Sequence, residues 1–300
     1  MYCRVGSTSW LMTHARAIFF RLLLLLTTIL ALVVPITATP VLSEDFSYPL
    51  GELNGQSGGT GLGPWTAITA ITEIVDPGSP LVYAVPGGGV VNGGNRALMI
   101  TGNGDNALYS SLAVPSSSNE VFISFLFQFV SGTIEDNDFA AFWFDNVTTG
   151  THTTVPSLGL KSNRGNGSGV EDLMARERLG SEVYATNITL GSTYFIVGRL
   201  WKSTPGSGNN YNRFDLWVNP AFGDMLTPLA TSSGPGSIAS FGVLGLRSVN
   251  IDAGEVILFD SLRAGTSWSD VVPSAAPEPG SFAICGLALL VLGFRKLFSS

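Results

Sequence analysis

Short runs in which large apolar residues alternate with other residues recur through the middle of this 300-residue chain, and glycine-rich turns separate them. In the clearest run, 121–129, every second residue from Val121 to Phe129 is apolar, which places five side chains on one face of a strand. A helical period is compatible with only one short stretch, 170–179. Many short strands between glycine-rich turns are typical of an antiparallel sandwich or barrel, so we expect an all-β fold.

Further runs of the same kind predict more strands. They span residues 139–144, 194–201, 214–218, 241–246 and 255–262. No internal repeat is visible, which disfavours a propeller or a solenoid.

The charge and cysteine content exclude several classes of protein. Residues 41–276 contain 21 acidic and 10 basic residues, a net charge of −11 in a chain whose net charge is −7. An acidic surface repels nucleic-acid phosphates, so nucleic-acid binding is not expected. Both cysteines, Cys3 and Cys285, lie outside this stretch, so a disulfide does not stabilise it, and its length suffices to bury a core without one.

The N-terminal residues have the pattern of a secretory signal peptide. Arg16 and Arg21 precede an apolar run at residues 22–34, and Ala38 supplies a small residue for cleavage. We expect a signal peptide over residues 1–38, cleaved after Ala38. An uncleaved N-terminal anchor is the alternative.

The C-terminal residues combine a stiff tripeptide, an apolar run and a basic end. Pro277, Glu278 and Pro279 favour an extended backbone, and residues 280–298 would span about 28 Å as a helix, enough to cross a bilayer. Arg295 and Lys296 would stop transfer and remain cytoplasmic.

Residues 277–300 resemble the PEP-CTERM sorting signal of bacteria that make extracellular polysaccharide. The resemblance implies recognition and processing by exosortase, a membrane protease. It also implies export to the cell envelope or beyond, with a transient membrane anchor.

Residues 41–272 are similar to exported proteins with a concanavalin A-like (LamG-like) jelly roll. The resemblance lies in Glu44-Asp45-Phe46-Ser47-Tyr48, in Asp215-Leu216-Trp217-Val218-Asn219-Pro220, and in the segment from Phe259 to Trp268. It implies an antiparallel jelly-roll sandwich in which residues 42–48 pair with residues 256–263. The expected organisation is therefore a signal peptide (1–38), a β-sandwich (39–272) and a sorting signal with a transmembrane helix (273–300).

One acidic cluster, Glu135-Asp136-Asn137-Asp138, precedes the run at 139–144. Glycosidases use two carboxylates across the scissile bond, and strand alternation would place Glu135 and Asp138 on opposite faces. A solvated turn is the leading interpretation of this cluster. A calcium site formed by Asp136, Asn137 and Asp138 is the alternative, although the EF-hand spacing is absent.

His152 is the one histidine between the terminal segments, so neither a zinc cage nor a Ser-His-Asp triad is expected. It lies in a threonine-rich stretch and is interpreted as an exposed loop residue. We therefore expect no catalytic residue and no transition metal in the chain.

The runs 194–201 and 213–218 can form a hairpin around residue 207. Facing residues would then pair Arg199 with Asp215 and Trp201 with Arg213, and would place Trp217 opposite Val197. Aromatic and charged side chains on one side would suit a sugar, whereas the ordinary alternative is a cross-strand ion pair with cation–π packing. The candidate glycan surface consists of Trp201, Arg213 and Trp217, with Arg199 and Asp215 between them.

Together these patterns predict an exported, non-enzymatic surface or matrix protein that associates with extracellular polysaccharide. The alternative is a carbohydrate-binding or carbohydrate-active protein, such as a glycosidase or lyase, on the same jelly roll.

Overall fold

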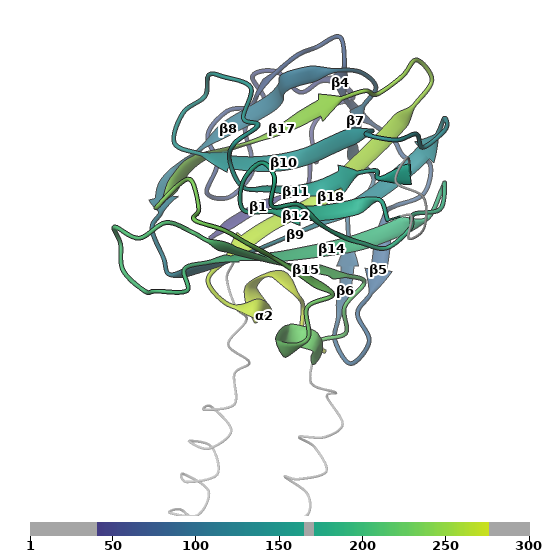
Figure 1. The fold of residues 1–300 in the computed structure, drawn as a ribbon. Helices are drawn as coiled ribbons and strands as arrows, with labels where there is room; N and C mark the ends of the chain where they lie inside the picture. Colours follow the sequence, from purple (N-terminus) through teal and green to yellow (C-terminus); the bar gives the residue numbers. More distant parts are fainter. Residues whose placement is uncertain (1–40, 165–170, 276–300) are drawn as a thin grey trace, which may run out of the picture. The chain divides into compact units, whose positions relative to one another are not determined.

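The computed structural model describes residues 41–164 and 171–275, which belong to one compact unit. Their regular secondary structure is almost entirely strand, in agreement with the alternating sequence runs (Figure 1). All strand pairs are antiparallel. The predicted all-β antiparallel sandwich is confirmed.

Two large sheets form the layers of the sandwich within the described residues. The nine-stranded sheet follows the order β16 (Ala230–Ser233), β15 (Arg213–Val218), β14 (Thr193–Trp201), β9 (Glu120–Ser131), β18 (Val256–Gly265), β7 (Ala97–Ile100), β4 (Thr72–Val75) and β2 (Gly51–Glu52), with β1 (Leu42–Glu44) also paired to β18. The seven-stranded sheet follows the order β13 (Val183–Ala185), β12 (Leu173–Arg176), β11 (Ser157–Lys161), β10 (Phe139–Asp145), β17 (Phe241–Val249), β8 (Gly104–Ser116) and β3 (Thr66–Ala67).

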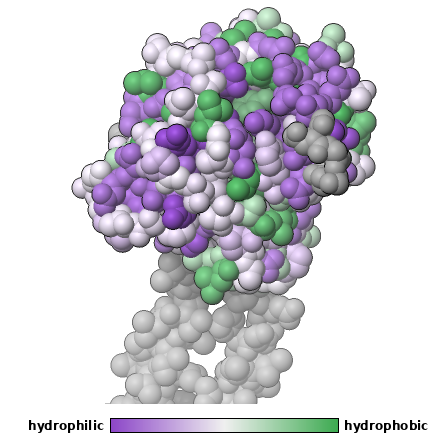
Figure 2. All heavy atoms as spheres, in the orientation of Figure 1, coloured by the Kyte–Doolittle hydropathy of each residue, from purple (hydrophilic) through white to green (hydrophobic). Residues whose placement is uncertain are grey.

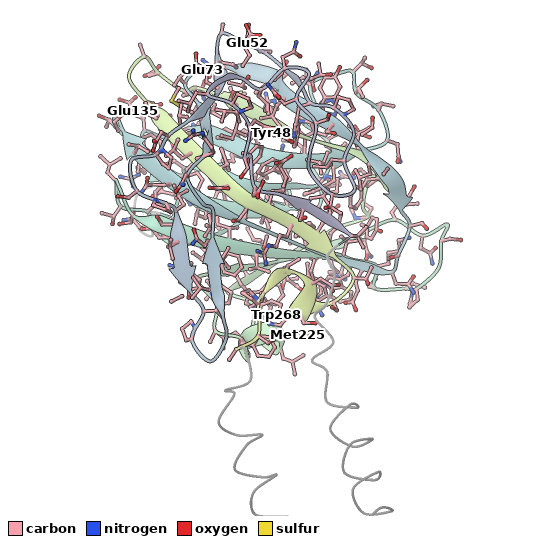
Figure 3. All side chains as sticks on the ribbon, turned by 180° about the vertical axis from the view of Figure 1, so that it is seen from behind. Tyr48, Glu52, Glu73, Glu135, Met225 and Trp268 are labelled. Carbon is pink, nitrogen blue, oxygen red and sulfur yellow. The ribbon has the colours of Figure 1, made fainter. Side chains whose placement is uncertain are left out.

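Figure 1 looks onto the seven-stranded sheet, where β8, β17, β10, β11 and β12 follow one another. Figure 3, from the opposite side, brings β18 of the nine-stranded sheet to the front. The remaining elements are the hairpin of β5 (Val82–Ala84) and β6 (Val90–Asn92), the 3₁₀ turn η2 (Asp224–Leu226) and the short helix α2 (Trp268–Val271).

The main core fills the space between the two sheets. On β9, the alternate residues from Val121 to Phe129 all lie in this core, as the sequence predicts. Phe125, Phe142 and Phe259, from three strands of the two sheets, pack with ring centroids 5.0–5.8 Å apart. Tilted and edge-on contacts of this kind stabilise aromatic pairs beyond the area that they bury.

A second apolar cluster covers the outer face of the nine-stranded sheet. Phe122 and Leu126, which alternate with the core residues of β9, pack here with Trp217, Trp268 and residues of the β5–β6 hairpin. Both faces of this sheet are thus buried over much of their area, whereas alternation at 121–129 predicts only one face of β9 in a core.

The predicted strands are confirmed as β9, β10, β14, β15, β17 and β18, with ends shifted by at most three residues. The predicted pairing of the first and last strands is also confirmed, since Leu42 pairs with Ala264 and Glu44 with Leu262. The short helix allowed at 170–179 is wrong. Residues 173–176 form β12, because sheet pairing with β11 and β13 outweighs the weak local helical pattern.

No helix within 41–164 and 171–275 is long and apolar enough to cross a membrane. The predicted signal peptide with Ala38, the tripeptide Pro277-Glu278-Pro279, and the basic pair Arg295 and Lys296 lie outside the described residues.

Candidate functional site

The predicted register of the β14–β15 hairpin is confirmed. Arg199 pairs with Asp215, Trp201 with Arg213, and Val197 with Trp217. The carboxylate of Asp215 is nearly inaccessible to solvent and accepts hydrogen bonds from Arg199 Nε at 2.8 Å, Trp201 Nε1 at 3.0 Å and Thr231 Oγ1 at 2.7 Å. Asp215 therefore fixes the positions of the guanidinium and the indole, and both Trp201 and Arg213 remain half-buried.

Trp217 does not belong to an exposed glycan surface. Its side chain is buried, its ring centroid lies 5.1 Å from that of Trp268, and its Nε1 donates to the carbonyl oxygen of Asp224 at 2.8 Å. Helix α2 and the η2 segment cover it, and Figure 3 shows Trp268 and Met225 close together at this end of the sandwich. Strand alternation predicts the face on which a residue lies, but not whether a distant segment covers that face.

The acidic cluster at 135–138 is only partly the solvated turn that the sequence predicts. Glu135, Asp136 and Asn137 are exposed, but Asp138 is buried and its Oδ2 accepts the backbone N–H of Glu135. Burial, together with the charges of Glu255, Glu135 and Asp252, raises the pKa of Asp138 to about 7. Within the described residues, no three histidine, cysteine or acidic side chains are arranged to hold a metal ion.

The interpretation of His152 as an exposed loop residue is wrong. Its side chain is buried on the outer face of the seven-stranded sheet, where it stacks on Trp143 with ring centroids 3.6 Å apart. Its Nδ1 lies 3.0 Å from Oδ2 of Asp145. The loop that carries His152 folds back over β10, a contact that the local polar sequence does not signal.

Strand alternation places further charged and aromatic residues on the outer face of the seven-stranded sheet. Their neighbours along the strands, such as Leu160 and Leu246, point into the core, so these residues point away from it. Figure 2 shows this side of the molecule as hydrophilic over most of its area, with small separate hydrophobic patches. The group, which we call the cationic face, consists of Phe139, Lys161, Arg176, Glu182, Tyr184 and Arg247.

Two guanidinium groups of the cationic face share one aromatic ring. The Cζ atoms of Arg176 and Arg247 each lie 5.3 Å from the ring centroid of Phe139. Arg247 Nε also donates to Oδ1 of Asp105 at 2.9 Å, while its own side chain remains partly exposed. Arg176 is buried beneath the surface, and this burial lowers its pKa. The negative π-face of Phe139 thus helps to hold two like charges close together.

A single carboxylate, that of Glu182, contacts two of the three cations. Glu182 Oε1 lies 3.1 Å from Arg176 Nη1 and 3.5 Å from Lys161 Nζ. Burial acts to raise the pKa of Glu182, but hydrogen bonds to the backbone and to Arg176, and the charge of Lys161, outweigh it and hold the pKa below its usual value. Nε of Arg176 is buried and has no hydrogen-bond partner among the described residues.

Tyr184 lies next to Lys161, on the edge strand β13 of the seven-stranded sheet. The Lys161 ammonium is 6.0 Å from the centroid of the Tyr184 ring. Between Tyr184 and Arg247 the strands present Met174, Gly159 and Ala141, which face one another in successive registers. A side chain at Gly159 would collide with the backbone of β10. No side chain therefore rises from the sheet at this position.

No sequence motif predicts the cationic face. Its residues come from five strands and one loop end, spaced over more than 100 positions, and none forms a local motif. The register of the seven-stranded sheet is needed to bring them together.

No protein-family model matches the sequence, and no curated protein matches it. Solved structures give weak matches. An alginate lyase variant in complex with alginate tetrasaccharide is 14% identical with a TM-score of 0.46, over 77% of this chain and 98% of that one. An endo-β-1,4-glucuronan lyase from the fungus Trichoderma reesei is 12% identical with a TM-score of 0.40, over 77% and 99% of the two chains. A glycosyl hydrolase family protein from Mycobacterium fortuitum is 14% identical with a TM-score of 0.37, over 75% and 99%.

These matches contradict the expectation that the chain is not an enzyme, since they are with two polysaccharide lyases and a glycosyl hydrolase family protein. That expectation rested on the lack of paired carboxylates at 135–138 and on the single histidine, His152, between the terminal segments. Carboxylates are not the only groups that transfer protons, because lysine and tyrosine side chains also do so. Lys161 and Tyr184 lie on separate strands, so their proximity is not visible in the sequence.

Proposed function

We propose that the chain is a carbohydrate-active protein that binds an acidic, uronate-containing polysaccharide on the cationic face and cleaves it by β-elimination. The observation that carries the proposal is the concentration of Lys161, Arg176 and Arg247 on one face of an otherwise acidic molecule. Lys161 lies beside the phenol of Tyr184, and the two guanidinium groups lie against the ring of Phe139. Alginate and glucuronan, the polymers named for two of the matched lyases, are the substrates to test first.

The exposed groups of the face match the charge of such a polymer. Arg247 and Lys161 are partly exposed and can meet a uronate carboxylate, for which a guanidinium offers a paired hydrogen-bond geometry. Arg176 is buried beneath them. Glu182 contacts both Arg176 and Lys161 and so helps to hold these two side chains in place. Neutralising the carboxylate of a uronate makes the proton on the adjacent C5 easier to remove.

Tyr184 is positioned to transfer the proton. As the phenolate, Tyr184 takes the C5 proton. The electron pair of that C–H bond forms a C4–C5 double bond, and the C4–O glycosidic bond breaks. The same proton then passes from Tyr184 to the departing oxygen. No water is consumed, so the products are one new chain end and one unsaturated uronate.

The test is an assay of the full-length chain on alginate, glucuronan and a neutral glucan. We expect the ultraviolet absorbance of the unsaturated uronate to rise with one or both acidic polymers and not with the glucan. New reducing ends without that absorbance would indicate hydrolysis and would contradict the proposal, as would the absence of any cleavage.

We further propose that this body is exported and sorted, on the concanavalin A-like jelly roll that the sequence resembles. The proposal is supported by the signal pattern that ends at Ala38, by Pro277-Glu278-Pro279, and by the basic residues Arg295 and Lys296. Exosortase would recognise the tripeptide while the C-terminal apolar run holds the chain in the membrane. In a host with active exosortase, Glu278→Ala should leave export intact and cause the unprocessed form to accumulate. Unchanged processing of this variant would contradict the sorting proposal.

A further inference from the structure

At the end of the β14–β15 hairpin, beyond Trp201 and Arg213, the surface is hollowed. The hollow has a volume of about 330 Å³ and is lined by Thr204, Gly208, Asn209, Asn210, Asn212 and Pro235. It adjoins the hairpin directly, because the N–H of Asn212 donates to the carbonyl oxygen of Trp201 at 3.1 Å. The hairpin belongs to the nine-stranded sheet, so this hollow is separate from the cationic face of the other sheet.

The side chains of the hairpin strands that lead to the hollow are held in place before any ligand binds. Asp215 fixes the indole of Trp201 and the guanidinium of Arg199, whose Cζ lies 5.1 Å from the centroid of the indole ring. Asn212 is fixed in turn, since its Oδ1 accepts the N–H of Ser203 and its Nδ2 donates to Ser203 Oγ. Preorganised planar groups lose little entropy on binding, which favours recognition of a sugar ring.

The charge beside the hollow favours an acidic sugar. The positive charge of Arg199 is compensated by Asp215 and Glu120. Arg213 forms no ion pair within 4 Å among the described residues, although the buried carboxylate of Glu177 is near enough to interact with its charge. Nη1 of Arg213 donates to the carbonyl oxygen of Asn212 at 2.7 Å. Because Asn212 lines the hollow, this bond holds the guanidinium of Arg213 next to it. Its remaining N–H groups can donate to a carboxylate.

We infer that this hollow, with Trp201 and Arg213 at its rim, is a second binding site for a uronate residue of the polysaccharide. The inference deepens the proposed function and rests on it for the class of polymer. Two sites on opposite sheets hold separate stretches of polymer, so that binding at one raises the local concentration at the other. A chain of this kind remains bound to the polymer between cleavage events.

The experiment measures binding rather than cleavage, by the retardation of the full-length chain in a native gel that contains alginate or glucuronan. Gly208→Leu fills the hollow, and a side chain at Gly208 meets no atom within 4 Å, so the fold is kept. Gly223→Leu is the matched control, because Gly223 is exposed, equally open to a side chain, and lies by η2 outside the hollow. Arg213→Gln removes the charge beside the hollow while keeping a planar group with N–H donors.

We expect Gly208→Leu and Arg213→Gln each to weaken binding about tenfold, and Gly223→Leu to bind as the unchanged chain does. The same differences are expected in a Tyr184→Phe background, whether or not the chain cleaves the polymer. Binding that is unchanged in both variants would overturn the inference, even if elimination is observed. Weakened binding without elimination would support the second site and contradict only the proposed reaction.

Discussion

The imidazole of His152 lies flat on the indole of Trp143, with ring centroids 3.6 Å apart and ring planes 1° from parallel. Beneath the indole lies Gly245 of β17, where any side chain would overlap the Trp143 ring. The absence of a side chain at Gly245 thus lets the indole lie close to the sheet. The stack fixes the loop that carries His152 to the face of the sheet on which the cationic face lies.

Replacing His152 should therefore loosen this loop and lower stability. His152→Ala removes the stacked ring and leaves Asp145 without its contact to Nδ1, and we expect a loss of about 2 kcal/mol in the free energy of unfolding. Thr154→Ala, at an exposed position of the same loop, is the control and should change stability by less than about 0.5 kcal/mol. Urea unfolding compares the two. Equal stabilities would show that the stack contributes nothing.

Replacing Glu44, at the edge of the core, should lower the free energy of unfolding. Its buried carboxylate accepts hydrogen bonds from the N–H of Phe46 at 2.7 Å, the hydroxyl of Tyr48 at 2.6 Å and Nε1 of Trp65 at 2.9 Å. Glu44→Ala leaves these three donors without their partner, so we expect a loss of about 3 kcal/mol or more.

The control for Glu44→Ala is Glu52→Ala, which removes an exposed carboxylate at the sheet edge visible in Figure 3. It should leave the free energy of unfolding nearly unchanged. A Glu44→Ala chain as stable as the Glu52→Ala chain would contradict the hydrogen-bond account.

Stability should fall as the pH rises from about 4 to about 8, because of Asp260. Burial, with added repulsion from Asp45 and Glu44, raises the pKa of Asp260 from 3.8 to about 8. Above pH 4 the unfolded chain releases this proton freely while the folded chain keeps it, so ionisation favours unfolding until the folded pKa is reached. Asp138, with a pKa of about 7, contributes in the same direction.

Asp260→Asn removes that share of the pH dependence. Between pH 5 and pH 8 we expect the stability of this variant to rise relative to the unchanged chain by on the order of 3 kcal/mol. Asp76→Asn, at an exposed carboxylate, should show no such trend. Urea unfolding at the two pH values is the measurement, and parallel pH profiles for Asp260→Asn and the unchanged chain would contradict the prediction.

The sequence was sufficient to predict the strands and one register. Alternation at 121–129 identified the core face of β9, and a hairpin centred on residue 207 predicted the β14–β15 register, because each depends on residues close together in the chain. The pairing of β1 with β18 followed from the resemblance to jelly-roll proteins.

Tertiary contacts determine what the sequence could not predict. Trp217 is buried because α2, fifty residues later, packs on it, and His152 is buried because its loop folds onto Trp143. The cationic face depends on the lateral order of β13, β12, β11, β10 and β17, which alternation within one strand does not encode. Local polarity is thus a poor guide to burial wherever a distant segment provides the cover.

The most direct test of the proposed elimination compares Tyr184→Phe with Tyr83→Phe. Tyr184→Phe keeps the ring beside Lys161 but removes the proton-transferring hydroxyl. Tyr83 lies on β5, in the two-stranded hairpin packed on the nine-stranded sheet, and its hydroxyl donates to the carbonyl oxygen of Asn219. The measurement is the rate at which the absorbance of unsaturated uronate appears on alginate or glucuronan. We predict a loss of about a hundredfold or more for Tyr184→Phe and a nearly unchanged rate for Tyr83→Phe. Equal rates for the two variants, or no unsaturated product from the unchanged chain, would contradict the account.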